Sequence, residues 1–292
     1  MYKLKEGKNN YQLIDCSTSI DLHTGEYVPS ARSRIGGSYD KPDFGHLVKF
    51  IYEFDDISML LPTQEPGVDS PYEDFVFHPE HEEIEYVISG SGTMFYPDGS
   101  TFDVKAGTCM YHAPGQPHRL RNHNPDPLNL LVVHSVKLSQ VARRRFEEGK
   151  KYAKKGGHKL VYCPDAPSRE APGFSGDAPD KGHYVSTIFE GEKACCIYVV
   201  MKPGNSSPMV DFVSHPEVKE LVYIVDGHGI GIYPDKAYNL RPGLAAYHAP
   251  EQPAKFWNNT TDEDLRLLVF YSTAKPGNVL RTHKKAVGFE VI

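Results

Sequence analysis

The sequence has no long apolar run, no paired-cysteine motif and no surplus of positive charge. No window among its 292 residues approaches the roughly 18 uncharged apolar residues of a membrane-spanning helix, and the opening MYKLKEGKNN has no apolar signal-peptide core. The five cysteines are odd in number and include no C-x-x-C pair, and the net charge is -6. We therefore expect a cytoplasmic protein with reduced thiols that binds neither nucleic acid nor an anionic membrane.

Turn-forming and aromatic residues are abundant, which favours an all-β chain. The sequence contains 25 glycines, 23 prolines, 18 tyrosines and 14 phenylalanines, and its 39% of apolar residues can bury a core. The length is comfortable for two domains of about 146 residues each. Alternating apolar segments predict strands at residues 47–54, 93–96, 107–112, 118–122 and 128–134.

One segment departs from this pattern and predicts a helix. Residues 139–155 begin with a capping serine, and seven of the 13 residues from 143 to 155 are basic. Such a run is typical of a solvated helix face, with a cationic lid over an anionic substrate as the alternative. Residues 163–182 are rich in Pro, Gly, Asp and Ser and predict a linker. The expected regions are an N-terminal arm with a first β-domain at 1–137, a helix and linker at 138–182, and a second β-domain at 183–292.

An internal repeat links the two halves of the chain. Aligning residues 66–98 with 203–235 at a constant offset of 137 gives 17 identities in 33 positions, which include P-G-x-x-S-P-x-x-D-F-V-x-H-P-E-x-x-E. After a slip of one residue, 107–122 matches 243–258, with Y-H-A-P-x-Q-P in both. Chance does not produce such a match, so the chain contains two copies of one β-domain.

The repeated residues resemble the two motifs of the cupin superfamily. The stretch H-P-E-H-E-E that leads to G-S-G at 90–92 resembles the first motif, and G-x5-A-P-G-x-P-H-x3-N at 107–122 resembles the second. Both motifs occur in order in both halves, over about 66–134 and 203–271. The resemblance implies a two-domain cupin, or bicupin, with a jelly-roll barrel (a double-stranded β-helix) in each half and a metal inside the barrel.

Carboxylates and imidazoles in such a barrel favour metal binding. An inward carboxylate costs several kcal/mol unless it is paired, protonated or bound to a cation, and imidazoles supply neutral nitrogen ligands. The resemblance places the metal-binding carboxylate at Glu83, because the spacing to the first motif glycine fits, and the histidines at His78 and His118. Val76 stands where the family has its first histidine, and His81 could replace that ligand.

A shifted register remains an alternative for the first motif. His81 and Glu85 match the spacing to Gly92 equally well. We favour Glu83 because the second copy keeps a glutamate at the matching Glu220, whereas Glu85 becomes Val222.

The second copy predicts a partly degenerate site. It retains His215 and Glu220 but has Ala254 in place of His118 and Val218 in place of His81. His248 could complete a second site made of His215, Glu220 and His248. Its counterpart His112 is present in the first copy too, so this pair, like His134 and His228, is more typical of satisfied core histidines.

We expect an enzyme that uses one divalent ion, either Fe, Mn, Ni or Zn, on a small polar or acidic metabolite. The cupin resemblance implies an oxygenase, isomerase, decarboxylase, lyase or hydrolase, without choosing among them. Tyr111, Gln116 and Arg119 flank the second motif and are candidates for substrate binding. The alternative is a non-catalytic bicupin that binds a sugar or organic acid or serves a structural role. By resemblance we also expect a homodimer.

Overall fold

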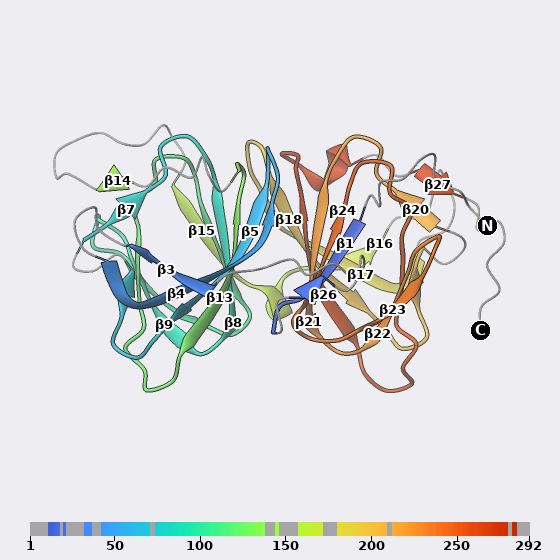
Figure 1. The fold of residues 1–292 in the computed structure, drawn as a ribbon, viewed down its shortest axis with the longest axis horizontal. Helices are drawn as coiled ribbons and strands as arrows, with labels where there is room; N and C mark the ends of the chain where they lie inside the picture. Colours follow the sequence, from blue (N-terminus) through green and yellow to red (C-terminus); the bar gives the residue numbers. More distant parts are fainter. Residues whose placement is uncertain are drawn as a thin grey trace. The chain divides into compact units, whose positions relative to one another are not determined.

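The described residues form β-strands in two units. The computed structural model describes residues 11–17, 20–21, 32–36, 42–70, 74–137, 144–145, 157–171, 180–208, 212–279 and 282–284. The N-terminal unit comprises Ser30–Ala166 and Gly191–Lys193, and the C-terminal unit comprises Met1–Pro29, Pro167–Glu190 and Ala194–Ile292. Figure 1 shows the strands of each unit curving around a barrel. Within the described ranges, no helix is long and apolar enough to cross a membrane.

The N-terminal unit is built from three sheets. Its strands are β3 (Arg32–Gly36), β4 (Pro42–Glu53), β5 (Ser58–Gln64), β6 (Asp69–Ser70), β7 (Val76–Phe77), β8 (Glu83–Ser89), β9 (Ser91–Phe95), β10 (Thr101–Lys105), β11 (Thr108–His112), β12 (Arg119–Arg121), β13 (Leu128–His134), β14 (Arg144–Arg145) and β15 (His158–Tyr162). The sheet orders are β15-β11-β8-β13-β5-β4-β3, β10-β9-β12-β6 and β14-β7. The 3-10 helix η2 (Cys163–Asp165) follows β15.

The C-terminal unit repeats this arrangement. Its strands are β1 (Tyr11–Asp15), β2 (Ile20–Asp21), β16 (Arg169–Ala171), β17 (Asp180–Glu190), β18 (Cys195–Met201), β19 (Ser206–Ser207), β20 (Phe212–Ser214), β21 (Glu220–Asp226), β22 (Gly229–Ile232), β23 (Ala237–Leu240), β24 (Leu244–His248), β25 (Lys255–Trp257), β26 (Leu265–Tyr271) and β27 (Thr282–Lys284), with the 3-10 helix η3 (Pro276–Asn278). The sheet orders are β2-β1-β24-β21-β26-β18-β17-β16, β23-β22-β25-β19 and β27-β20. Apart from β2, which has no counterpart, the strand order matches that of the N-terminal unit, which confirms the predicted pair of all-β barrels.

The outer neighbour of β11 and that of β24 come from different parts of the chain. In the N-terminal unit β15 pairs with β11, with His158 opposite His112. In the C-terminal unit β1, from the start of the chain, pairs with β24 in the same register, with Tyr11 opposite His248. Figure 1 shows β1 in dark blue among the orange and red strands. The sequence prediction placed residues 1–137 together, whereas the strand pairing assigns Tyr11–Asp15 to the C-terminal unit.

The predicted helix at 139–155 is wrong for the part that the structure describes. Arg144–Arg145 form strand β14, which pairs with β7 as β27 pairs with β20 in the other unit. The other residues of 139–155, and 172–179 of the predicted linker, lie outside the described residues. The described part of the chain contains no α-helix. A sequence periodicity cannot reveal that an edge strand, β7, is open for pairing at this point.

Glycine turns allow each barrel to close. Gly90 has a φ of 84°, and a Cβ there would lie 2.5 Å from the Pro127 carbonyl oxygen. Gly227 takes the same conformation in the C-terminal unit, next to the Asp264 carbonyl. Because only glycine tolerates both the left-handed backbone and this close approach, the turn that leaves β8 or β21 depends on it. Behind the turns, apolar side chains such as Val87, Met94 and Met110 fill the core.

Candidate metal centre

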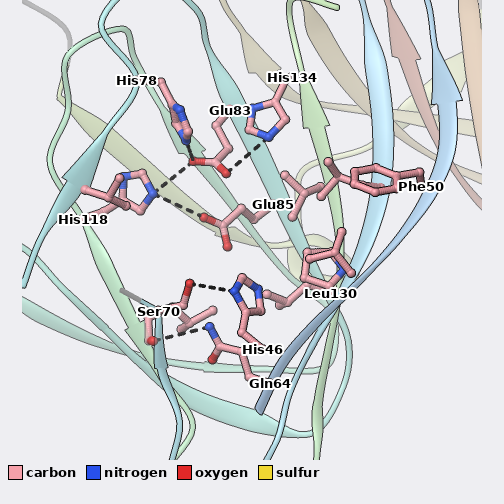
Figure 2. A pocket seen from close by; sticks show the side chains of 16 residues that line it. His46, Phe50, Gln64, Ser70, His78, Glu83, Glu85, His118, Leu130 and His134 are labelled. Atoms are coloured by element: carbon pink, nitrogen blue, oxygen red, sulfur yellow. Dashed lines mark hydrogen bonds and ion pairs between the residues drawn. The ribbon is translucent and has the colours of Figure 1, made fainter. Parts of the chain in front are cut away.

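The site is centred on the carboxylate of Glu83, the first residue of β8. Its Oε2 atom lies 3.0 Å from Nε2 of His118 and 3.2 Å from Nε2 of His78, and its Oε1 atom lies 3.8 Å from Nε2 of His134. Figure 2 shows the three imidazoles directed at this carboxylate from different segments. All four side chains are buried. The structure thus brings together His78, Glu83 and His118, as predicted.

Strand pairing explains how the side chains converge. Strand β8 lies between β11 and β13, so Glu83 faces His112 on one side and His134 on the other. His118 is joined to the strand β7 backbone by an isolated bridge to Val76. Glu85 lies two residues along β8 and therefore on the same face as Glu83. Its Oε1 atom is 3.4 Å from Nδ1 of His112.

The hydrogen bonds of His118 leave one nitrogen for the site. Its Nδ1 lies 3.0 Å from the Gln116 carbonyl oxygen, and because a carbonyl only accepts, Nδ1 carries a hydrogen and donates it. The opposite nitrogen, Nε2, then faces the Glu83 carboxylate. Two lone pairs cannot face each other at 3.0 Å without a cation or a second proton between them. Metal-bound histidines are commonly held in this way by a carbonyl behind the ring.

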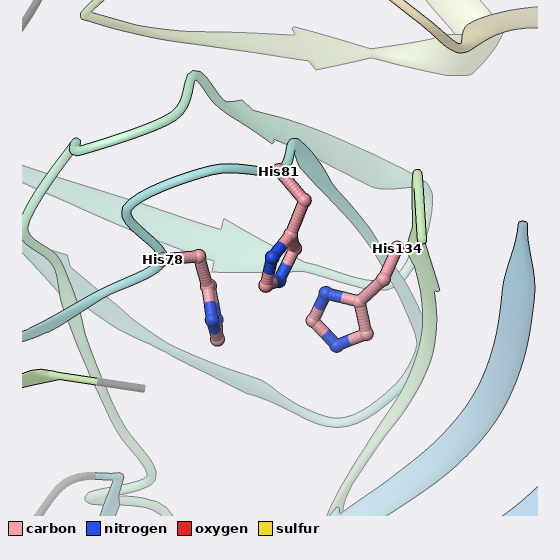
Figure 3. A group of neighbouring side chains, drawn as sticks. All are labelled: His78, His81 and His134. Atoms are coloured by element: carbon pink, nitrogen blue, oxygen red, sulfur yellow. The ribbon is translucent and has the colours of Figure 1, made fainter. Parts of the chain in front are cut away.

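His81 lies in the loop before β8 rather than on the strand. Its side chain is 2% exposed, and its Nε2 atom has no hydrogen-bond partner among the described residues. Its ring centre lies 4.5 Å from that of His78 and 5.1 Å from that of His134 (Figure 3). The structure therefore places His81, the possible additional ligand predicted from the sequence, beside the imidazoles of His78 and His134.

The charges of the site respond to burial and to one another. Burial alone would raise the pKa of Glu83, but the imidazoles of His78 and His118 hold it well below its usual range. Burial acts against protonation of His118, yet the Glu83 charge outweighs it and raises the pKa of that ring. Burial lowers the pKa of His112 well below its usual value and that of His81 to about 3. The last two rings are therefore neutral at pH 7 and can act as ligands.

A cavity of about 240 Å³ adjoins these residues. Apolar side chains form much of its wall, including Phe50, Leu60 and Leu130. A second polar group, made of His46, Gln64 and Ser70, belongs to the same lining but lies away from Glu83 (Figure 2). The full lining is His46, Val48, Phe50, Leu60, Pro62, Gln64, Ser70, Val76, His78, Glu83, Glu85, His118, Leu120, Leu130, Val132 and His134.

The donor set fits a divalent cation. Glu83 and Glu85 are both buried beside the cavity, and its lining contains no lysine or arginine. Protonating both His78 and His118 would neutralise the carboxylates only by placing two like charges with ring centres 6.0 Å apart. One divalent ion offsets both carboxylates without that repulsion. The separations between Glu83 Oε2 and the two Nε2 atoms, 3.0 and 3.2 Å, also fit metal ligands. Two atoms that each bind one ion at about 2.1 Å, with a right angle between the two bonds, lie about 3 Å apart.

The residues predicted to bind substrate lie elsewhere. Tyr111 donates its hydroxyl hydrogen to Glu82 at 2.7 Å. Gln116 donates from Nε2 to the Pro117 carbonyl and holds His118 through its own carbonyl. The Arg119 guanidinium stacks over the rings of Phe75 and Phe95. None of the three lines the cavity, so a substrate-binding role for them stays a prediction.

Sequence reasoning missed three residues of the cluster. His112 and His134 were interpreted as core histidines, and Glu85 only as part of an alternative register. The structure groups Glu83, Glu85, His112 and His118 closely enough for their ligand atoms to share an ion. The sequence did contain a signal, because His112 and His134 each end a predicted strand, and Glu83 lies at an end of a strand as well. Only the pairing of β11 and β13 with β8 shows that these strand ends lie side by side.

In the C-terminal unit, a hydrogen bond connects two of the three residues predicted as a second metal site, His248 and Glu220. Nδ1 of His248 lies 2.6 Å from Glu220 Oε2, and its Nε2 lies 2.8 Å from the Tyr233 hydroxyl. A neutral His248 that donates to Glu220 and accepts from Tyr233 makes both bonds at once. His215 lies 3.7 Å from Glu220, and Ala254 faces Val213 where the other unit pairs His118 with Val76. Among the described residues of this unit no cluster of ligand atoms close enough to share an ion occurs.

The Glu220 carboxylate also lies beside a cavity, which has a volume of about 280 Å³. Burial would raise the pKa of Glu220, but His215 and His248 lower it to about 2. The cavity wall is largely apolar, and Arg169 and Lys255 are part of its lining. The C-terminal unit therefore keeps a ligand-sized cavity without a convergent metal-ligand set.

Comparison with known proteins agrees with this geometry. Residues 63–134 match the family model described as the cupin domain, and no curated protein matches the chain. The protein YlbA from E. coli is 12% identical, with a TM-score of 0.63 over 91% of this chain and 92% of that chain. A putative glyoxylate-induced protein from Pseudomonas aeruginosa is 13% identical, with a TM-score of 0.64 over 92% and 91%.

An enzyme of known activity shares the fold as well. The Lactobacillus farciminis oxalate decarboxylase, solved as a formate complex, is 14% identical, with a TM-score of 0.59 over 95% of this chain and 90% of that chain. Such low identity shows the fold alone. Residues 63–134 therefore match the cupin domain, and the chain as a whole shares its two-barrel fold with these structures.

Proposed function

We propose that the protein is a metal-dependent bicupin enzyme that acts on a small polar or acidic metabolite in the N-terminal unit. The observation that carries this proposal is the buried Glu83 carboxylate with imidazole nitrogens of His78 and His118 at 3.2 and 3.0 Å beside a cavity of about 240 Å³. A bound divalent ion would act as a Lewis acid on a substrate oxygen or activate a water molecule. Fe, Mn, Ni and Zn all suit these mixed nitrogen and oxygen ligands.

The protein's own residues orient the ligands and exclude water. The Gln116 carbonyl fixes the ring of His118, and the Tyr96 hydroxyl lies 3.1 Å from Nε2 of His112, which directs the other nitrogen of that ring to the carboxylates. The apolar side chains of Phe50 and Leu130 lower the polarity of the cavity and strengthen the electrostatic interactions at Glu83.

The second polar group of the cavity favours a substrate with two polar ends. Ser70 Oγ lies 3.3 Å from Nδ1 of His46. Gln64 is 1% exposed, and its Oε1 atom accepts no hydrogen bond from the described residues. This oxygen can accept a hydrogen bond from a substrate hydroxyl or amine while the other end of the substrate reaches the metal.

Metal content per chain tests the proposal. We expect at least one equivalent of a divalent metal in untagged protein purified without chelator, and its loss in His118→Asn. His228→Asn is the matched control, because this exposed histidine pairs with Glu263 outside the site. Circular dichroism verifies that the variants fold. Equal metal content in wild type and His118→Asn, or none in reconstituted wild type, contradicts the proposal.

A second candidate function is binding without catalysis. The observation that favours it is the apolar cavity of about 280 Å³ in the C-terminal unit, where Glu220 is already paired with His248. A purely binding protein would be stabilised by an organic acid or a sugar without metal, and it would show no turnover. A cytoplasmic homodimer remains our proposal for the assembly, and light scattering of the purified protein tests the dimer.

A further inference from the structure

More ligand-type side chains surround Glu83 than one ion needs. Seven buried residues with imidazole or carboxylate groups fall into two groups whose ligand atoms lie close together. One group contains Glu83, Glu85, His112 and His118, and the other contains His78, His81 and His134. A single ion in a protein usually takes three or four side-chain ligands. The three-histidine group therefore requires an explanation of its own.

The three rings have the spacing of ligands to one ion. Their centres lie 4.5, 5.0 and 5.1 Å apart. Imidazoles that bind one ion through a nitrogen at about 2.1 Å have ring centres roughly 4.5–5.5 Å apart. Figure 3 shows the rings of His78, His81 and His134 next to one another, with His81 drawn between the other two. The Nε2 atom of His81, which has no described hydrogen-bond partner, is the independent sign that a ligand is missing.

The two groups meet at one carboxylate. Glu83 Oε2 lies 3.0 Å from Nε2 of His118 in one group and 3.2 Å from Nε2 of His78 in the other, and Oε1 lies 3.8 Å from Nε2 of His134. A carboxylate that contacts both groups can serve two metal ions, which in two-metal sites lie about 3.5–4 Å apart. We propose that His78, His81 and His134 bind a second divalent ion, which shares the Glu83 carboxylate with a first ion held by the group of Glu83, Glu85, His112 and His118. This inference rests on the proposed metal-dependent function of the same unit.

Charge balance identifies what else the two ions require. Two divalent ions bring more positive charge than the two carboxylates of Glu83 and Glu85 can offset. The cavity supplies no further acidic residue, since the rest of its lining is apolar or uncharged apart from histidine. An anion must therefore accompany the second ion, either hydroxide or the carboxylate of an acidic substrate. The pair of ions thus favours an acidic metabolite over a neutral sugar.

Metal stoichiometry in matched variants tests the inference. Metal-free full-length protein is loaded with Mn(II), dialysed and analysed for metal content and by electron paramagnetic resonance. We expect two equivalents and an exchange-coupled spectrum in the wild type, and one equivalent with an isolated Mn(II) spectrum in His81→Asn. Glu220→Gln is the control for the other unit and should retain two equivalents. Adding acetate should tighten the second equivalent only.

Each other result overturns the inference in a distinct way. One equivalent in the wild type removes the second ion but leaves the proposed function intact, whereas none removes both. Two equivalents that persist in His81→Asn place the second ion elsewhere, and a loss in Glu220→Gln locates it in the C-terminal unit. If His81→Asn does not fold, His134→Gln serves as the second variant, with the same expected loss of one equivalent.

Discussion

The two units place a glutamate at the same point of the same fold, buried at Glu83 and partly buried at Glu220, and surround it with different partners. Glu83 and Glu220 each begin the central strand and each lie opposite a histidine on one side. On the other side Glu83 faces His134, whereas Glu220 faces Tyr271. Glu220 lies within hydrogen-bond distance of Nδ1 of His248, whereas Glu83 faces the Nε2 atoms of His78 and His118, which require a cation or a second proton between them and the carboxylate. A few substitutions on one scaffold therefore separate a metal-type site from a proton-satisfied one.

The largest expected difference between the two units is in metal affinity. Glu83→Gln should weaken metal binding by at least about 100-fold, because loss of groups that only support ligands already costs 10–100-fold. Glu220→Gln should leave the affinity unchanged. Titration of metal-free protein measures both variants. Equal losses in the two variants would show that the units do not differ in the way the hydrogen bonds indicate.

The acid stability of the C-terminal unit should depend on Glu220. The pKa of Glu220 is lowered from 4.5 to about 2 in the folded protein. The stability it contributes is present above pH 4.5 and is lost as the pH falls towards 2, about 3 kcal/mol in all. Trp257, the single tryptophan, lies on β25 and reports unfolding of the C-terminal unit alone.

Urea unfolding of metal-free protein, followed by Trp257 fluorescence across this pH range, measures that loss. Glu220→Gln should flatten the pH dependence by the Glu220 contribution. Glu217→Gln is the matched control, because Glu217 is exposed in the loop just before β21. An unchanged pH profile in Glu220→Gln would mean that another group carries the acid sensitivity.

The equivalent glycines Gly107 and Gly243, which precede β11 and β24, differ in how tightly their surroundings are packed. Gly107 and Gly243 have φ values of 94° and 84°, but only Gly107 is crowded, because a Cβ at this position would lie 2.8 Å from the Tyr162 ring. Gly243→Ala should cost about 1 kcal/mol for its backbone, whereas Gly107→Ala should cost about 2–3 kcal/mol because it also displaces Tyr162. Hydrogen exchange of the β11 and β24 amides measures each cost, and equal protection losses would argue against the crowding.

The smallest expected effect is the partial restoration of a site. Ala254→His returns the imidazole that His118 supplies in the other unit. His248 stays bound to Glu220 and Tyr233, so we expect only weak zinc binding and a rise of about 2–4 °C in the Trp257 unfolding midpoint with excess zinc. Ala254→Asn should show no such rise. A midpoint that zinc does not move in Ala254→His would mean that the ligand set needs more than this imidazole.

The sequence predicted much of the fold because it carries the fold twice. The repeated glycine turns and motif residues indicated two barrels, and strand β13 at 128–134 was predicted with its observed bounds. The helix prediction failed because the strand β14 is set by an open edge at β7, which lies far away in the sequence. The pairing of β1 with β24 in the C-terminal unit could not be predicted for the same reason, because the residue pattern of a strand does not show which strand it pairs with.

The sequence by itself determined the two β-domains, because spacing within a repeated motif is a local property, and its resemblance to the cupin motifs predicted the set of His78, Glu83 and His118 and its partial loss in the second copy. Only the tertiary structure decided that His112 and His134 stand on either side of Glu83 and that His81 joins a three-histidine group. Those positions depend on the register between strands distant along the chain. The physical reason is that register is set by the packing of both barrel faces together, which no single segment encodes.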